Sequence, residues 1–224
     1  MKKKLNNKIP YVLFALLIFF TGCKNSIINK GDNPEGEGSG VEYNPPEKQI
    51  PLTLEAIADG EITFYNLDYI TGLKYTINGN DPVIITETSG SKTIQVSAND
   101  VVSLFAQGTS NANTLTDDLS ECFRINCSAD CYVYGNIMSL LADNFQNLTT
   151  ITQKKAFTAL FYNNKHIKNH SEKNIVLPAT ILTDYCYYGL FYNCSLLSKA
   201  PTLSVKTLSL GCYGAMFHGC SSLT

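Results

Sequence analysis

The sequence predicts a mainly β protein with α/β repeats, in which a small antiparallel β-sandwich precedes a short solenoid of stacked repeats. Short apolar runs alternate with polar residues through the first half of the chain, and this period of two is typical of half-buried strands. In the last third, a pattern of leucine, phenylalanine and cysteine recurs after 26 residues, which indicates stacked repeats. The 13 Tyr and 11 Phe, with no Trp, suit sheets and stacked coils.

Residues 1–22 are expected to be a signal peptide. A basic start, MKKKLNNK, precedes an uninterrupted apolar run over residues 11–20, which is about half the length that a membrane-spanning helix needs. Two small residues then lead into Cys23, and the ending Phe-Thr-Gly-Cys resembles the lipobox of bacterial lipoproteins. The resemblance implies cleavage before Cys23 and attachment of an acyl chain such as palmitate to its thiol. An uncleaved anchor with an incidental cysteine is the alternative.

Residues 23–49 are expected to be this lipidated cysteine followed by a flexible linker. The segment is rich in Gly, Pro and acidic residues and has almost no large apolar side chain, so it cannot bury enough surface to fold. Such a tether suits display on the bacterial cell surface from the outer membrane, with a periplasm-facing lipoprotein as the alternative. From Cys23 onward the chain carries 13 basic and 19 acidic residues, which excludes bulk electrostatic attraction to nucleic acid.

Residues 50–150 are expected to form the β-sandwich, with about seven strands. Turn pairs such as Asp59-Gly60, Asn78-Gly79 and Ser89-Gly90 separate the alternating runs. The expected strands lie at 52–56, 62–64, 73–77, 93–96, 102–106, 122–127 and 131–134. A short helix is expected at 137–145, where the apolar residues fall on one face.

Residues 151–224 hold the repeat. Residues 177–198 aligned with 203–224 at an offset of 26 give eight identities in 22 positions, and a fainter earlier copy places Phe161 30 residues before Phe191. A period of 26 falls within the range of about 20–29 residues that leucine-rich repeats show. The expected core of the repeat is Leu177, Leu182, Cys186, Leu190, Phe191, Cys194, Leu197, Leu203, Leu208, Cys212, Met216, Phe217, Cys220 and Leu223.

Each repeat is expected to contain a short helical turn, because Cys186, Leu190 and Cys194 recur at helical spacing. Residues 197–203 are expected to form a brief strand and a corner. Neither piece can bury its apolar face alone, but coils stacked at about 4.8 Å build a continuous core. No divergent unit follows Leu223, so the solenoid is expected to be incomplete and to expose an apolar edge there.

The repeat units resemble a known family. CYYGLFYNCSLL (186–197), CYGAMFHGCSSL (212–223) and the corner LPAT (177–180) are similar to the BspA-type leucine-rich repeats of bacterial surface lipoproteins. CYVYGNIMSLLADNF (131–145) resembles the segment that joins a β-domain to such repeats. Ser-Val-Lys replaces Pro-Ala-Thr at 204–206 and only two full units are present, so a truncated member is expected. The resemblance implies a cell-surface adhesion or interaction protein, and some relatives bind host matrix proteins or other bacteria.

Recognition of a host or bacterial surface protein or matrix component is therefore the expected role, with the lipid anchor as the contact to the membrane and no nucleic-acid partner. Variable positions outside the repeat core predict a contact face formed by Tyr188, Tyr192, Lys199 and His218. The nucleophile elbow, the metalloprotease motif, the P-loop and the dinucleotide fingerprint do not occur. We therefore expect no enzymatic activity, no catalytic residue and no cofactor.

A carbohydrate-binding or glycan-hydrolysing β-domain is the alternative function. The carboxylates of glycosidases leave no short motif, so the absence of such motifs does not exclude this class. Tyr65, Tyr69 and Tyr75 are candidates for stacking on sugars, although tyrosines in strands more often serve as core or cross-strand partners.

The remaining cysteines and histidines are given mainly structural roles. Cys186 with Cys212, and Cys194 with Cys220, are expected to stack in neighbouring coils as small buried hydrophobes. The C-x4-C-x3-C cluster Cys122, Cys127 and Cys131 leaves three alternatives open, namely one disulfide, buried thiols or three zinc ligands. His166 and His170 are four residues apart in a polar segment, and no metal site is expected there.

Overall fold

The computed structural model describes residues 46–70, 72–106 and 119–224. The predicted signal peptide, the lipid-attachment residue Cys23 and residues 23–45 of the predicted linker lie outside the described residues. Within the described part of the chain, no helix combines the length and the apolar character that crossing a bilayer requires.

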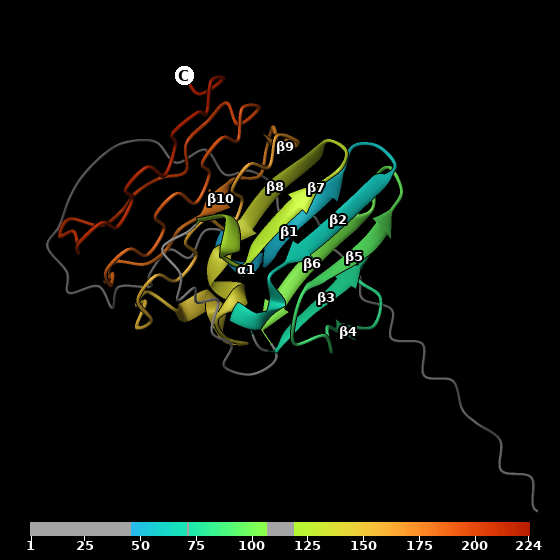
Figure 1. The fold of residues 1–224 in the computed structure, drawn as a ribbon, viewed down its shortest axis with the longest axis horizontal. Coiled ribbons are helices and arrows are strands. Elements are labelled where there is room, and N and C mark those ends of the chain that lie inside the picture. The colour runs from blue at the N-terminus through green and yellow to red at the C-terminus, as the bar shows by residue number, and fades with distance from the viewer. Residues whose placement is uncertain (1–45, 71, 107–118) are drawn as a thin grey trace, which may run out of the picture. The chain divides into compact units, whose positions relative to one another are not determined.

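The described chain is mainly β, as predicted, and its strands form two sheets (Figure 1). The larger sheet has the order β10-β8-β1-β6-β3-β4, with β9 also paired to β8. Its strands are β1 (Leu52–Ala56), β3 (Leu73–Ile77), β4 (Val83–Ile84), β6 (Val101–Ala106), β8 (Cys131–Asn136), β9 (Ile167–Asn169) and β10 (Ile175–Val176). The smaller sheet has the order β5-β2-β7, formed by β2 (Gly60–Tyr65), β5 (Ser91–Val96) and β7 (Arg124–Cys127).

The buried faces of the strands follow the predicted alternation. Leu54 of β1, Phe64 of β2 and Leu104 of β6 are all completely buried, and they belong to one hydrophobic cluster that continues into the C-terminal third of the chain. A buried hydroxyl joins two of these strands, because Ser139 Oγ accepts the Leu52 N–H at 2.9 Å and donates to the Leu104 carbonyl at 2.8 Å. This pairing satisfies backbone groups that would otherwise be buried without partners.

The continuous helix predicted at 137–145 was wrong. Two short 3-10 helices, η3 (Ile137–Leu140) and η4 (Phe145–Asn147), occupy this segment. Asn136 Oδ1 accepts the Met138 N–H at 3.0 Å, and the Leu141 N–H bonds to the Met138 carbonyl at 2.9 Å, which is the i→i−3 pattern of a 3-10 helix. The other short helices are α1 (Pro46–Gln49), η1 (Leu67–Tyr69) and η2 (Leu119–Glu121).

Two strands from the C-terminal third of the chain join the larger sheet. β9 and β10 both pair with β8 in parallel, whereas all other pairings between the strands are antiparallel. β9 and β10, which follow the predicted boundary at residue 150, are therefore hydrogen-bonded to a strand that precedes it. The described residues belong to one compact unit.

Three coils with the same backbone conformation lie side by side after β8 (Figure 1). We call them coil 1 (residues 155–164), coil 2 (185–194) and coil 3 (211–220). In each coil, residues at four corresponding positions have a left-handed backbone, with φ between 51° and 73°. These residues are Lys155, Phe157, Ala159 and Asn163; Tyr185, Tyr187, Gly189 and Asn193; and Gly211, Tyr213, Ala215 and Gly219. The conformation thus repeats at offsets of 30 and 26.

The helical turn predicted within each repeat was wrong. Residues with a left-handed backbone alternate with others in the coil, so the chain makes successive i→i−3 turns and cannot continue as an α-helix. The N–H groups that do not form these turns donate to the next coil instead, as Phe161 does to the Leu190 carbonyl and Phe191 to the Met216 carbonyl, both at 3.0 Å. The coils are therefore joined by backbone hydrogen bonds in the manner of strands.

The connection between coils 2 and 3 also differs from the prediction. Residues 197–203 contain no strand, and two predicted core residues, Leu203 and Leu208, are 41% and 62% exposed. In the preceding unit the apolar corner Leu177-Pro178-Ala179 is buried. At the equivalent positions of the second unit, Ser204 and Lys206 are exposed. Polar side chains at these positions favour contact with solvent over burial of the corner.

The outer edge of coil 3 presents a row of backbone donors. Coils 1 and 2 use the N–H groups at four equivalent positions to bond the following coil. In coil 3 these positions are occupied by Gly211, Ala215, Phe217 and Gly219, and their N–H groups have no hydrogen-bond partner in the described part of the chain. Leu208 and Leu210, which precede coil 3 in the chain, are 62% and 66% exposed.

Candidate functional site

Two internal columns of aromatic rings hold the coils in register. Neighbouring rings in both columns are nearly parallel, with centroids between 5.5 and 5.8 Å apart and planes within 11°. The columns are Phe161-Phe191-Phe217 and Phe157-Tyr187-Tyr213. Because the rings repeat at the same offsets as the backbone, side chains on the outer face of each coil are also placed above one another.

An outer column follows from this register and contains two of the predicted contact residues. Tyr192 stacks on His218 with the ring centroids 4.5 Å apart and lies 5.3 Å from Tyr162 on the other side. Beside it, Asn193 Nδ2 donates to Asn163 Oδ1 at 2.8 Å. We call Tyr162, Tyr192, His218, Asn163 and Asn193 the outer column. Tyr162 and the two asparagines were not predicted, although extending the offset of 30 from Phe161 would have aligned Tyr162 with Tyr192.

Tyr188 lies on the same coil as Tyr192 but rests against coil 3. A Cβ added at Gly214 would lie 2.6 Å from Tyr188 Cδ2, so the absence of a side chain at 214 makes room for the Tyr188 ring. Tyr185 packs against Tyr188 edge to face, with centroids 5.9 Å apart. Tyr188 is therefore half-buried by its own neighbours, and part of its ring is used in packing between coils 2 and 3.

Lys199 lies apart from the outer column, so the four predicted contact residues do not form one face. Lys199 Nζ donates to Asn174 Oδ1 at 2.9 Å, and its backbone N–H donates to Asn169 Oδ1 at 2.9 Å. It lines a pocket of about 400 Å³ together with residues of α1, β10 and the corner at 200–204. Lys199 belongs to the connection between coils 2 and 3, which lines this pocket beside β10.

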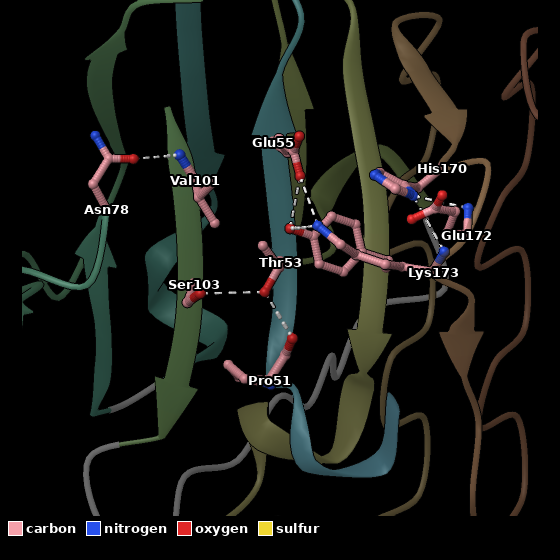
Figure 2. Close-up of polar contacts among 10 residues, drawn as sticks. Pro51, Thr53, Glu55, Asn78, Val101, Ser103, His170, Glu172 and Lys173 are labelled. Atoms are coloured by element: carbon pink, nitrogen blue, oxygen red, sulfur yellow. Dashed lines mark hydrogen bonds and ion pairs between the residues drawn. The ribbon is translucent and has the colours of Figure 1, made fainter. Parts of the chain in front are cut away.

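A polar cluster occupies the face of β1 and β8 next to the β9–β10 connection (Figure 2). Glu55 Oε2 accepts hydrogen bonds from Tyr134 Oη at 2.8 Å and from Lys173 Nζ at 3.1 Å. Lys173 Nζ also lies 4.3 Å from the centroid of the Tyr134 ring. Burial alone raises the pKa of Glu55, but the hydrogen bonds from Tyr134 and Lys173 outweigh it and hold the pKa below its ordinary value. The cluster fastens the connection to the sheet.

The two histidines lie in different environments, on either side of β9. His166 Nδ1 is 3.1 Å from Asp130 Oδ1, whereas His170 Nδ1 accepts the N–H groups of Glu172 and Lys173 at 3.0 and 3.1 Å (Figure 2). Among the described residues, no group of three or more His, Cys, Asp or Glu side chains could hold a metal ion.

The cysteines of the coils pack as predicted. Cys186, Cys194, Cys212 and Cys220 are at most 8% exposed. Cys194 Sγ donates to the Phe161 carbonyl and Cys220 Sγ to the Phe191 carbonyl, both at 3.0 Å, so each thiol bonds the preceding coil. Burial raises the pKa of Cys186 to about 11. In the cluster between the sheets, Cys127 and Cys131 are free thiols. Cys131 Sγ donates to the Ala129 carbonyl at 3.5 Å, and Cys122 is buried.

No protein-family model, curated protein or solved structure matches the chain. The geometry places a set of exposed and half-buried aromatic and amide side chains in register at the surface of the coils. Its members come from three coils, and their spacing is set by the backbone hydrogen bonds and ring columns beneath them.

Proposed function

We propose that the protein is a lipid-anchored cell-surface protein that uses the outer column to bind another surface or matrix protein. The observation that carries this proposal is the alignment of Tyr162, Tyr192 and His218 in one row at the surface, in which the two tyrosines are half-buried and His218 is exposed. Tyrosine supplies a large contact area at low cost in side-chain entropy, and aromatic residues are enriched where proteins bind each other.

In this proposal the coils are a short BspA-type leucine-rich-repeat solenoid, and the two sheets are the β-sandwich on which it is built. The repeating left-handed positions, the hydrogen bonds between coils and the stacked rings support a solenoid, since each unit contacts its neighbours in the same way. The predicted lipobox at Cys23 and the linker after it would place this structure on the outer membrane, at a distance from the bilayer. The protein would therefore act by recognition, without catalysis.

Rigidity is the physical reason that the outer column suits binding. Side chains that are already ordered lose little conformational entropy when a partner docks. The Asn193–Asn163 hydrogen bond and the Tyr192–His218 stack fix the side chains before any contact is made. A partner would meet a row of ring edges and amide groups at intervals of about 5 Å, the spacing between neighbouring coils.

Point variants test the proposal better than truncation, because deleting residues 150–224 would remove β9 and β10 from the sheet. Binding of the full chain to immobilised fibronectin, laminin and fibrinogen is compared with binding of a Tyr162→Ala, Tyr192→Ala, His218→Ala triple variant. We expect binding to at least one of these proteins and a loss of about tenfold or more in the variant.

The matched control carries three exposed substitutions on the β3–β4 edge, namely Asn80→Ala, Val83→Ala and Ile84→Ala. It should retain the affinity of the unmodified chain. Equal affinity of all three proteins would remove the outer column from the binding surface, and absence of binding to the whole panel would count against a matrix-protein partner.

A further inference from the structure

A second site lies where the small sheet meets coil 1. An open pocket of about 310 Å³ is lined by residues of β2, β7 and the end of coil 1. Its lining residues are Glu61, Thr63, Tyr65, Asn126, Cys127, Ser128, Asn163, Lys165 and His166. This volume is at the lower end of the range of about 300–1,000 Å³ that small-molecule sites occupy.

Several polar groups in the pocket keep unused hydrogen-bonding capacity. The Tyr65 hydroxyl, the Asn126 amide and the Lys165 ammonium have no hydrogen-bond partner among the described residues. Asn163 uses its Oδ1 to accept from Asn193, which leaves its Nδ2 as a donor. The pocket thus offers a hydroxyl, two amides and an ammonium to a ligand, whereas the side chains of Glu61, Thr63, Ser128 and His166 are already engaged.

The neighbouring groups that are engaged hold the pocket in shape. Glu61 Oε1 accepts from Gln95 Nε2 at 2.8 Å, and Ser128 Oγ accepts the Glu61 N–H at 2.9 Å. The Arg124 guanidinium lies 4.7 Å from the centroid of the Tyr65 ring. These contacts fix the carboxylate and the aromatic wall before a ligand arrives, so a ligand would not have to order them.

The lining composition selects among classes of ligand. Tyr65 and Cys127 are the apolar members of the lining, so an apolar side chain or an acyl chain would bury little of its surface against apolar groups there. One carboxylate, Glu61, and one ammonium, Lys165, balance each other in charge, which favours a neutral ligand over a polyanion. Amides and hydroxyls that can both donate and accept match the hydroxyl groups of a sugar, and a sugar ring can pack its C–H face against an aromatic wall.

We propose that this pocket binds a neutral saccharide of one or two rings, with Tyr65 as the aromatic wall and Asn126, Asn163 and Lys165 as hydrogen-bonding partners. The site is distinct from the outer column, although Asn163 belongs to both. It would allow the protein to hold a glycan through the small sheet independently of any protein bound along the coils.

The test uses NMR titration of the full ¹⁵N-labelled chain with glucose, galactose, mannose and N-acetylglucosamine. At least one of these sugars should shift the backbone amides of residues 61–65, 124–128 and 163–166. Asn126→Ala should weaken that binding about fivefold, the effect of losing one net hydrogen bond of ordinary strength. Tyr65→Phe, which keeps the ring and removes the hydroxyl, should weaken it by a similar or smaller factor.

Asn80→Ala, at an exposed turn outside the pocket, serves as the control and should bind with unchanged affinity. Titrations with glucuronate and with a blocked dipeptide distinguish the other ligand classes. Tighter binding of either one than of every neutral sugar would overturn the proposal. So would the absence of shifts with all four sugars, or shifts that Asn126→Ala and Tyr65→Phe leave unchanged. Loss of protein binding in the outer-column variant, with sugar binding retained, would show that the two sites are separate.

Discussion

The ring of Phe191 lies parallel to that of Phe217, with the centroids 5.8 Å apart and the planes inclined by 5°. Phe191 is completely buried and lies between Phe161 and Phe217 in its column. The two outer rings come from coils at different offsets, 30 residues before and 26 after. A polar loop of variable length is thus accommodated outside the column without changing how the rings pack.

Phe191→Ala should destabilise the fold by about 3–5 kcal/mol, since it removes a buried ring that packs on both faces and leaves a cavity. Urea unfolding followed by circular dichroism measures the loss. Tyr162→Ala removes a half-buried ring at the end of the outer column and should cost about 1 kcal/mol or less. Similar losses for the two variants would mean that the inner column does not hold the coils together.

The thiols of Cys186 and Cys194 should fail to react with Ellman's reagent in the native protein at neutral pH. Both are completely buried, and burial raises the pKa of each thiol above its ordinary value, so little of the reactive thiolate forms. Denaturant should release both for reaction. An exposed cysteine introduced by Asn80→Cys serves as the positive control, and rapid native labelling of Cys186 or Cys194 would show that the coils open in solution.

Glu55→Gln should lower stability at neutral pH by about 1 kcal/mol or less, because the Glu55–Lys173 pair is partly exposed to solvent. The pKa of Glu55 lies below its ordinary value of 4.5 in the folded protein. Its contribution is therefore present above pH 4.5 and is lost as the pH falls through the lowered folded value. The difference in unfolding free energy between the two proteins should shrink in that range, and a constant difference would assign the effect to packing alone.

Cys23→Ser should abolish incorporation of radiolabelled palmitate and release the protein from the membrane fraction, if the proposed lipobox is used. Acyl chains supply the free energy of anchoring, about 0.8 kcal/mol for each buried methylene. Cys127→Ser is the matched control, because this buried thiol lies far along the chain from the predicted leader and should leave labelling intact. Unchanged membrane association of Cys23→Ser would favour an uncleaved apolar anchor.

The strands were predictable because alternation and turn residues act locally. The predicted runs at 52–56, 62–64 and 102–106 coincide with or lie within β1, β2 and β6. β4 was missed because Val83 and Ile84 form a strand of two residues that are both exposed, so no period could reveal it. Local propensity and burial therefore account for most of the sheet assignments.

The coils were predictable in period but not in conformation. Leu190 and Cys194 are four residues apart, and this spacing fits an α-helix as well as two successive turns of a coil. A left-handed backbone at Phe157, Tyr187 and Tyr213 is unfavourable for residues with a side chain and is marked by nothing in the local sequence. It is sustained by hydrogen bonds to neighbouring coils and by ring stacking, which are tertiary interactions.

The row of N–H groups on coil 3 sets a rule for what can extend this stack. If two copies met through this edge, the N–H groups of one copy would face the N–H groups of the other, and no hydrogen bonds could form between them. These groups belong to Gly211, Ala215, Phe217 and Gly219. At the opposite end, the Ile125 N–H bonds the Leu160 carbonyl, so one of the four equivalent acceptor positions is already used within the chain. The coil 3 edge therefore has a polarity, and only a chain that presents a row of carbonyl oxygens to it would continue the pattern of hydrogen bonds between coils.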